Sequence, residues 1–154
     1  MRGTGLRGRG ERLRKGNTIM SYDNYGPGNL AGFVEHALDA LTPHASEFDS
    51  IAVRGVSGVI VGAPVAVLLG KPLIIVRKDD ELSHAHNNAH RVSNGRFAGR
   101  RYLILDDFTI TGATIQEIEA QMTAHTPAQA AAWYLYGNDS AQYTIIRPNP
   151  VLWG

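Results

Sequence analysis

The sequence predicts an α/β protein, with a parallel sheet of four to five strands flanked by helices. Short apolar runs of the length typical of buried strands recur along the chain, at 49–54, 73–77, 102–105 and 130–136. Segments with helical patterning separate them, and this alternation favours parallel strands joined by right-handed crossovers. A chain of 154 residues with 44% hydrophobic residues can bury one core.

The first 18 residues differ in composition from the rest. They are rich in Gly and Arg, and residues 1–16 carry a net charge of +5 although the whole chain carries +1. We therefore expect residues 1–18 to form a disordered basic tail and residues 19–154 to form a single domain. Such a tail can contact nucleic acid, but a solvated tail, or upstream sequence from a mis-assigned start, is the reading that we favour.

Composition also limits the chemistry and the compartment. The chain has no cysteine, which excludes disulfides and thiolate metal sites and is compatible with a reducing cytoplasm. We find no apolar run near the ~18 residues that span a bilayer, and the basic N-terminus lacks the apolar stretch of a secretory signal. We expect a cytoplasmic protein without a membrane partner.

The first half of the chain reads as helix, strand, helix, strand. Apolar residues recur at three- and four-residue spacings over 30–41, which predicts an amphipathic helix ended by Pro43. The strand 49–54 leads into a tight turn at 55–58, and 59–69 is predicted to be a buried helix despite the proline within it. The strand 73–77 then follows.

The second half begins with a segment that lacks apolar periodicity. Residues 79–100 are predicted to be a long loop, and loops of this length in compact domains are usually functional. The strand 102–105, a helix at 114–124 and the strand 130–136 follow. Residues 143–146 form a short strand, which we place at an edge of the sheet.

Two adjacent acids mark the end of the strand 102–105. Asp106 and Asp107 point to opposite faces of an extended backbone, so they can hold different groups of one polar ligand. The loop 109–114 can curl its N–H groups around an anion, and the next helix adds its positive N-terminal end. The combination indicates a phosphorylated sugar, whereas the alternative is an ordinary polar turn.

The stretch 102–114 resembles the signature of the type I phosphoribosyltransferases, which consists of four apolar residues, two acids and a loop ending Thr-Gly-x-Thr. The resemblance covers roughly residues 48–137, and the part at 51–78 is most similar to adenine-type members. It implies the family's fold, with a small hood built from the chain ends. It also implies transfer of a phosphoribosyl group from phosphoribosyl pyrophosphate (PRPP) to a nucleobase, with a purine favoured, with Mg²⁺ as cofactor and with a homodimer as the common assembly.

The resemblance assigns roles to individual residues. Asp106 and Asp107 would act in catalysis by binding the ribose hydroxyls, directly or through water on Mg²⁺. Ser83 and His84 would act with them from a lid formed by 79–100. The 5′-phosphate would be bound by Thr109, Ile110, Thr111, Gly112, Ala113 and Thr114. The pyrophosphate would be bound by Arg54, Gly55, Val56, Ser57, Arg77 and Lys78.

Several alternatives stay open beside this assignment. Arg91 and Arg96 are further candidate anion contacts, and three histidines at 84, 86 and 90 could bind a metal. A serine nucleophile at Ser57 is rejected because it would need glycine at position 59. A PRPP-sensing or nucleic-acid-binding regulator on the same fold is the main rival function.

Ile110 departs from the hypoxanthine/guanine members, which carry an acid at that position, and the residues that contact the base are not identified. Tyr22, Tyr25, Tyr143 and Trp153 are aromatic candidates for that contact, although such residues more often serve packing alone.

Overall fold

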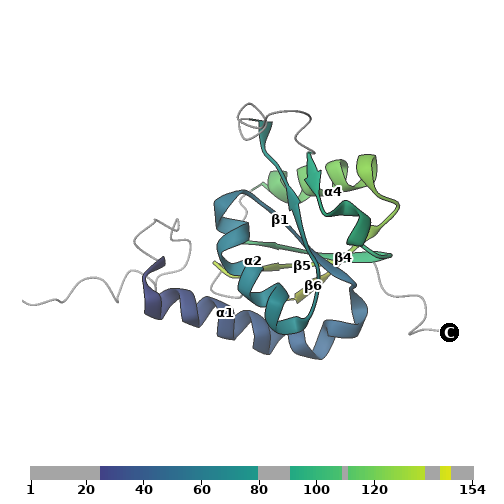
Figure 1. Cartoon of the computed structure of the whole chain (residues 1–154). Helices are drawn as coiled ribbons and strands as arrows, with labels where there is room; N and C mark the ends of the chain where they lie inside the picture. Colours follow the sequence, from purple (N-terminus) through teal and green to yellow (C-terminus); the bar gives the residue numbers. More distant parts are fainter. Residues whose placement is uncertain (1–24, 80–90, 109–110, 138–142, 147–154) are drawn as a thin grey trace, which may run out of the picture.

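The computed structural model describes residues 25–79, 91–108, 111–137 and 143–146 (Figure 1). The strands are β1 (Ser50–Arg54), β2 (Leu73–Val76), β3 (Val92–Ser93), β4 (Arg101–Asp106), β5 (Gln129–Leu135) and β6 (Tyr143–Ile145). The α-helices are α1 (Pro27–Leu41), α2 (Gly55–Leu69) and α4 (Ala113–His125). The 3₁₀ helices are η3 (Thr42–Glu47) and η4 (Gly95–Phe97).

The sheet has six strands in the order β3-β2-β1-β4-β5-β6. The four central strands are parallel, whereas β3 and β6 pair antiparallel at the two edges. The predicted α/β class is confirmed. The predicted count of four to five strands is too low, because the edge strand β3 was not predicted. That strand is two residues long, which is too short to leave an alternating pattern in the sequence.

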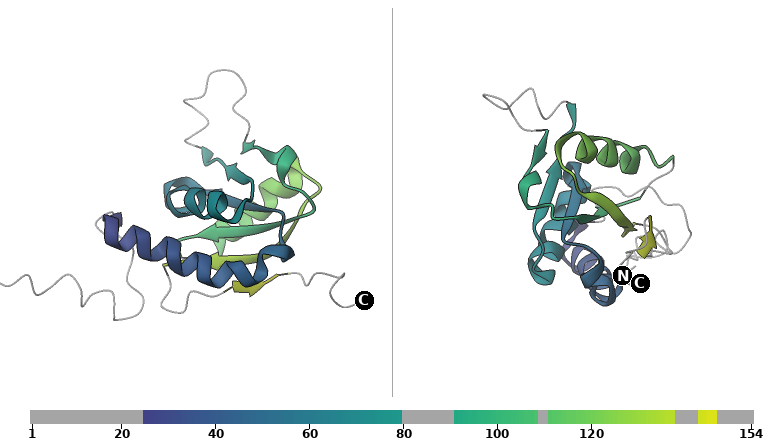
Figure 2. Two further views of the ribbon diagram at one scale, coloured as in Figure 1. Left: turned by 60° about the horizontal axis from the view of Figure 1, so that its bottom comes forward. Right: turned by 90° about the vertical axis from the view of Figure 1, so that its right-hand side faces the viewer.

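Helices cover both faces of the sheet (Figures 1 and 2). One face packs against α1 and α2, in a core that includes Leu41, Val53 and Val65. The other face packs against α4, in a core that includes Ile104 and Ile118. Because both faces are covered, β4 is buried from its second residue to its end, which accounts for its continuous apolar run.

Helix α2 begins earlier than its sequence indicates. The predicted tight turn at 55–58 is the first turn of the helix, which starts at Gly55 rather than at residue 59. A Cβ on Gly62 would lie 2.6 Å from Val53 Cγ1, and one on Gly58 would lie 3.0 Å from Val53 Cβ. These two glycines therefore let the helix lie directly against β1. Pro64 lies inside the helix without ending it.

The predicted loop 79–100 is regular in its second part. Val92 and Ser93 form β3, and η4 follows. The Ser50 hydroxyl donates to the Ala98 carbonyl at 2.8 Å, and the Asp49 carboxylate accepts the Arg100 amide at 2.7 Å. These contacts tie residues 91–100 to the start of β1, so they do not belong to a lid. The remaining part, with Ser83, His84 and the other predicted lid residues from 80 to 90, lies outside the described residues.

No helix in the described ranges is long and apolar enough to cross a membrane.

Candidate functional site

The carboxyl ends of the parallel strands meet at one edge of the sheet. Arg54 ends β1, Asp106 ends β4, and Lys78 follows β2 by two residues. Helices α2 and α4 both begin at this edge, so their N-termini face the same region. Open α/β sheets bind ligands at this edge, where the strand order reverses.

Asp106 and Asp107 differ in their surroundings. Asp106 is only 4% exposed, and its Oδ1 accepts a hydrogen bond from the Ser57 hydroxyl at 3.2 Å. Asp107 is half-buried beyond the end of the strand, and its carboxylate accepts the Phe108 amide at 2.8 Å. The bond from Ser57 joins two stretches that are 49 residues apart in the chain.

Burial raises the pKa of Asp106 from its ordinary value of 3.8 to about 7, and the negative charge of Asp107 contributes in the same direction. The hydrogen bond from Ser57 acts in the opposite direction but is the smaller effect. Asp106 is therefore partly protonated near neutral pH. A cation or a cluster of hydroxyl donors beside it would favour the ionised form.

The first turn of α2 has the features that favour an anion. The helix has no side-chain cap and no acid in its first turn, so the positive end of its dipole is uncompensated by side-chain charge. Gly55 has a φ of 72°, and a Cβ there would lie 3.0 Å from the Lys78 Nζ. The Lys78 ammonium therefore stands directly beside this turn.

The N-terminus of α4 has the same character. Gly112, with a φ of 77°, precedes the helix, which again has no side-chain cap and no acid in its first turn. The Thr111 hydroxyl accepts the Ala113 amide at 3.3 Å and so shapes the approach to the helix. Thr114 lies in the first turn. Thr109 and Ile110, the other two residues of the predicted phosphate loop, lie outside the described residues.

The basic residues fall into two groups. The Nε atoms of Arg54 and Arg77 are buried and have no hydrogen-bond partner within the described part of the chain. Arg54 lies at the end of β1, where its positive charge would favour an anion. The Arg77 guanidinium, however, donates to the Ser93 hydroxyl at 3.1 Å. Arg77 is thus held toward β3, whereas Lys78 is the member of the predicted pair that reaches the α2 turn.

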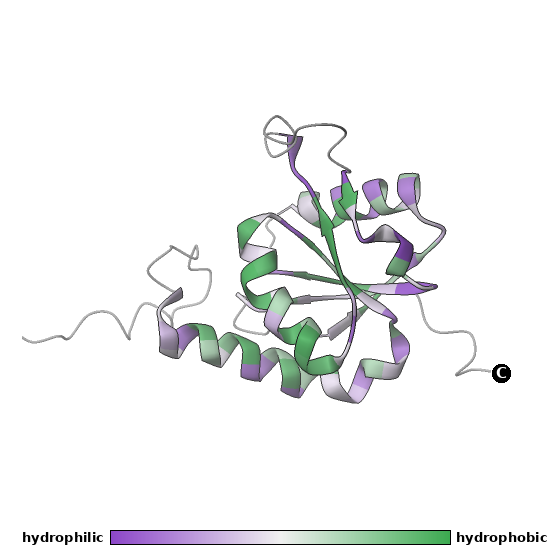
Figure 3. Cartoon of the chain, in the orientation of Figure 1, coloured by the Kyte–Doolittle hydropathy of each residue, from purple (hydrophilic) through white to green (hydrophobic). Residues whose placement is uncertain are grey.

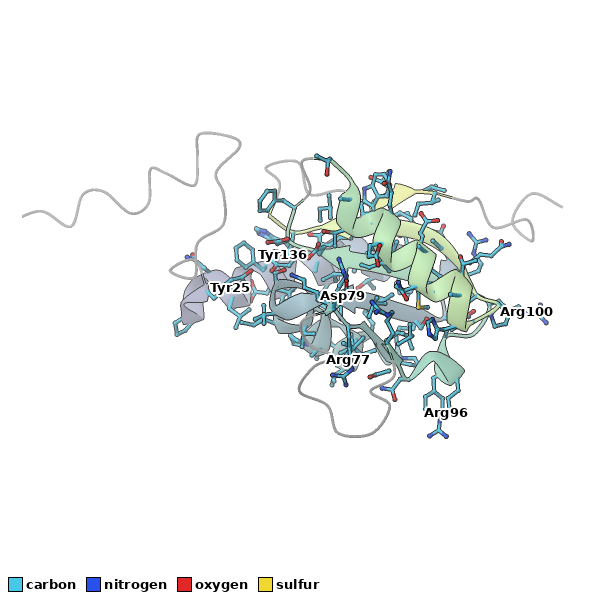
Figure 4. All side chains as sticks on the ribbon, turned by 90° about the horizontal axis from the view of Figure 1, so that it is seen from above. Tyr25, Arg77, Asp79, Arg96, Arg100 and Tyr136 are labelled. Atoms are coloured by element: carbon cyan, nitrogen blue, oxygen red, sulfur yellow. The ribbon has the colours of Figure 1, made fainter. Side chains whose placement is uncertain are left out.

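Each of the two additional candidate arginines has a partner of its own. Arg91 forms an ion pair with Asp79, and its hydrogen bond and charge lower the pKa of that carboxyl. Arg96 lies on η4, before β4 begins, with its guanidinium over the Phe97 ring at 4.6 Å. Figure 4 shows Arg96 well separated from Asp79. Because η4 lies at the amino edge of β4, Arg96 is not part of this site.

Tyr136 was not among the predicted site residues, although it lies within the site. It follows the last residue of β5, and its hydroxyl donates to the Ser57 carbonyl at 2.7 Å. Its amide donates to the Asp106 carbonyl at 3.1 Å. A tyrosine one residue beyond a strand parallel to β4 lies at the same edge of the sheet, and that position was the signal available in the sequence.

The donors at this edge suit a hard cation. Asp106 and Asp107 offer carboxylate oxygens, the ligand type that Mg²⁺ prefers. Within the described ranges no three His, Cys, Asp or Glu side chains gather into a metal-binding group. An ion here would therefore need oxygens from the ligand or from water to complete its coordination.

Known proteins with similar sequences are phosphoribosyltransferases, although no family model matches the chain. Over 78 residues it is 33% identical to an orotate phosphoribosyltransferase of Methanospirillum hungatei, covering 51% of this chain and 42% of that protein. Over 94 residues it is 31% identical to an adenine phosphoribosyltransferase of Desulforamulus reducens, covering 53% and 55%. The chain thus spans about half the length of these relatives.

Among solved structures, the chain is similar to the orotate phosphoribosyltransferase of Aeropyrum pernix. The TM-score is 0.60 at 14% identity, over 76% of this chain and 64% of that one. The chain has the type I phosphoribosyltransferase fold. The fold implied by the resemblance at residues 102–114 is thereby confirmed.

In this phosphoribosyltransferase fold, the described site residues divide by element. The α2 turn brings together Gly55, Val56 and Ser57, with Arg54 before it and Lys78 beside it. The end of β4 supplies Asp106 and Asp107, and the start of α4 supplies Thr111, Gly112, Ala113 and Thr114. Val56 has its side chain 64% exposed, so its contribution to anion binding would come from its backbone.

Proposed function

We propose that this chain is a phosphoribosyltransferase that moves the phosphoribosyl group of PRPP to a nucleobase nitrogen and releases pyrophosphate. The observation that carries the proposal is the 3.2 Å hydrogen bond from Ser57 to Asp106. It joins an anion-binding helix turn to a carboxylate suited to ribose hydroxyls. A ligand with phosphate groups at both ends of a sugar matches this juxtaposition and the second anion-binding turn at α4.

The ligand would lie along the carboxyl edge of the sheet. Its 5′-phosphate would bind the start of α4, through Thr109, Ile110, Thr111, Gly112, Ala113 and Thr114. Its ribose hydroxyls would contact Asp106 and Asp107. Its pyrophosphate would contact the α2 turn under Arg54 and Lys78, while Arg77, which is bonded to Ser93, would contribute charge from a greater distance.

Mg²⁺ is the cofactor that we propose, held by Asp106 and Asp107 through water. When bound, it would neutralise charge on the pyrophosphate and on the carboxylates. The raised pKa of Asp106 fits this arrangement, because a cation nearby replaces the proton that burial otherwise retains.

In the reaction, the bond from the anomeric carbon to the pyrophosphate oxygen breaks and a bond to the base nitrogen forms. Pyrophosphate leaves with the electron pair, and a base that carries a ring N–H gives up that proton to the departing pyrophosphate or to water. The chain's part is to stabilise charge on the leaving group with the α2 amides and Lys78, and to hold the sugar with its carboxylates. Ser83 and His84 are proposed to assist from the segment outside the described residues.

The acceptor base is proposed to be a purine. The adenine-type resemblance over residues 51–78 and the similarity to an adenine phosphoribosyltransferase support a purine, whereas the similarity to an orotate phosphoribosyltransferase favours a pyrimidine. Ile110 cannot exchange a proton, which disfavours hypoxanthine and guanine. We place the reaction in nucleotide salvage in the cytoplasm, in line with the absence of cysteine.

Pyrophosphate release tests the proposal directly. The protein is incubated with Mg²⁺, PRPP and each of adenine, hypoxanthine, guanine, xanthine, orotate and uracil. We expect release with one purine, and loss of at least tenfold in Asp107→Asn. Asp39→Asn, an exposed acid on α1, is the matched control and should retain activity. No release with any base, together with unchanged PRPP affinity in Asp107→Asn, would exclude the enzyme.

A PRPP-sensing or nucleic-acid-binding regulator is the second candidate function, favoured by the net charge of +5 in residues 1–16. Deletion of residues 1–19 separates the two. A regulator would turn over no base and would lose retention on nucleic acid after the deletion. An enzyme would keep its turnover.

We also propose that two copies of the chain associate through the outer face of α2. Three large apolar side chains are exposed on this helix, with Val56 at 64%, Val67 at 78% and Leu68 at 62%. Figure 3 shows α2 as hydrophobic along nearly its whole length, whereas α1 and α4 alternate with polar residues. A second copy of this face is the occupant that the family resemblance suggests.

A further inference from the structure

Three residues at the site form a closed ring of hydrogen bonds. The Ser57 hydroxyl donates to the Asp106 carboxylate at 3.2 Å, and the Tyr136 amide donates to the Asp106 carbonyl at 3.1 Å. The Tyr136 hydroxyl closes the ring by donating to the Ser57 carbonyl at 2.7 Å. The ring joins α2, β4 and the end of β5, which are adjacent in space but far apart in the chain.

The direction of the hydroxyl bonds follows from counting protons. The Tyr136 hydroxyl has one proton, and it is given to the Ser57 carbonyl, which can only accept. Tyr25 lies 2.8 Å from the Tyr136 oxygen, so Tyr25 must be the donor in that pair. Figure 4 shows the two tyrosines side by side. Tyr25 therefore donates to Tyr136, and Tyr136 donates to the Ser57 carbonyl.

The environment supports a fixed Tyr136. Its side chain is buried, and its ring packs against Phe33 at a centroid distance of 5.0 Å. Burial and the hydrogen bond with Tyr25 raise the pKa of Tyr136 far above its ordinary value, so the hydroxyl keeps its proton at all working pH values. A neutral, buried hydroxyl remains a donor to Ser57.

We propose that Tyr136 is a positioning residue that holds the α2 turn at a fixed separation from Asp106. The inference rests on the proposed function and goes beyond it. In PRPP the pyrophosphate on C1 and the hydroxyls on C2 and C3 occupy consecutive ring carbons, so the groups that bind them must keep a set distance. Tyr136 fixes that distance because its amide holds Asp106 and its hydroxyl holds the peptide of Ser57.

Tyr136→Phe removes the bond to Ser57 and keeps the ring and the amide. We expect the Kd for PRPP, measured by calorimetry with Mg²⁺, to rise about three- to tenfold, which is the range for one lost hydrogen bond. The Kd for ribose 5-phosphate should stay within twofold, because that ligand lacks the pyrophosphate. Tyr134→Phe, a buried tyrosine two residues earlier on β5, is the matched control and should leave both constants unchanged.

Tyr25→Phe tests the order of the hydrogen bonds from Tyr25 through Tyr136 to Ser57. Alone, it should weaken PRPP binding less than Tyr136→Phe, and in the Tyr136→Phe background it should have no further effect. If Tyr136→Phe weakens both ligands equally, or neither, the positioning role is excluded. PRPP binding that is weaker in the double variant than in Tyr136→Phe would also contradict the proposed order.

A ligand-free measurement separates this inference from the proposed function. Hydrogen–deuterium exchange of a peptide covering 55–61 should be at least threefold faster in Tyr136→Phe than in wild type and unchanged in Tyr134→Phe. Equal exchange in all three proteins would overturn the inference. A wild-type protein that binds neither PRPP nor ribose 5-phosphate would instead overturn the proposed function, whatever the exchange rates.

Discussion

Asp106 combines burial with a neighbouring charge, and this sets how its ionisation acts on stability. Its folded pKa of about 7 exceeds the ordinary value of 3.8. Well below pH 3.8 it is protonated in both the folded and the unfolded state, so the free energy of unfolding does not change with pH through this group. Between pH 3.8 and 7 the folded state binds more protons than the unfolded state, so the free energy of unfolding falls as pH rises.

We therefore expect Asp106→Asn to remove part of this pH dependence. Above pH 7 the ligand-free variant should melt ~3–6 °C above wild type, since relief of a buried charge on the order of 1–2 kcal/mol gives such a shift in a chain of this size. Its affinity for PRPP with Mg²⁺ should fall at least tenfold. Thermal melts from pH 4 to 9 provide the measurement, and parallel curves for the two proteins would contradict the assignment.

Substitution of Asp107 tests how far its charge sets the pKa of the Asp106 carboxyl. Because its charge raises the pKa of Asp106, Asp107→Asn should move the pH-dependent change in stability to lower pH rather than abolish it. A midpoint that stays near 7 would mean that burial alone sets the ionisation of Asp106.

Gly55 is a second residue of the proposed site, and its backbone is the part that we propose contacts the ligand. Gly55→Ala would strain a φ of 72° and place a Cβ 2.9 Å from the Lys78 Cε. Gly70→Ala carries the same kind of strain, at a φ of 66°, in open space. Each should lower the free energy of unfolding by about 1 kcal/mol. Only Gly55→Ala should weaken pyrophosphate and PRPP binding, and equal affinities in the two variants would exclude contact at this turn.

At the scale of the element, α2 is positioned by glycines rather than by an amphipathic stripe. Gly58 and Gly62 face Val53 on β1, and no larger residue fits between the helix and that strand without a shift. This close approach sets how far the first turn of α2 extends past the end of β1. Substitution of these glycines should therefore shift the whole helix, including its first turn at the candidate site.

Gly62→Ala should destabilise the protein by roughly 1–3 kcal/mol, because its Cβ would meet Val53 Cγ1 at 2.6 Å. Gly32→Ala, at a position in α1 with nothing within 4 Å, should instead stabilise it by about 0.5–1 kcal/mol. Urea unfolding measures both. Adding Val53→Ala to Gly62→Ala should recover part of the lost stability, and a purely additive double variant would argue against the contact.

For the whole molecule, the strand order places the site. The chain passes from β1 outward to β2 and then returns to β4 on the other side of β1. The crossover connections thus leave in opposite directions at β1 and β4, which is the place where open α/β sheets generally bind ligands. The hydrogen bond between Ser57 and Asp106 spans this point.

Self-association is the prediction at this scale. Val67→Glu would place a charge in the exposed apolar face of α2 and should convert a dimer into a monomer in sedimentation experiments, with the unfolding temperature within a few degrees of wild type. Ala120→Glu, an exposed site on α4, is the control and should leave the assembly unchanged. A wild-type monomer at all concentrations would refute the interface.

Local sequence chemistry predicts a large share of this site. Two acids after a buried strand, and Gly and Thr before a helix, predict a polar ligand and an anion from their bonding capacity alone. The stretch 102–114 therefore indicated a sugar-phosphate site before its surroundings were known. The paired basic residues were less predictable, because alternation on an extended backbone sends Arg77 toward Ser93 and Lys78 toward Gly55.

The sequence by itself determined the α/β class, the order of the central elements and the carboxylates at the end of β4, since all of these follow from patterns among near neighbours in the chain. Only the tertiary structure decided that Ser57 meets Asp106, that Lys78 stands beside Gly55 and that Tyr136 ties them together. Those contacts join residues from 23 to 79 positions apart. Their formation depends on strand order and helix packing, which no local pattern encodes.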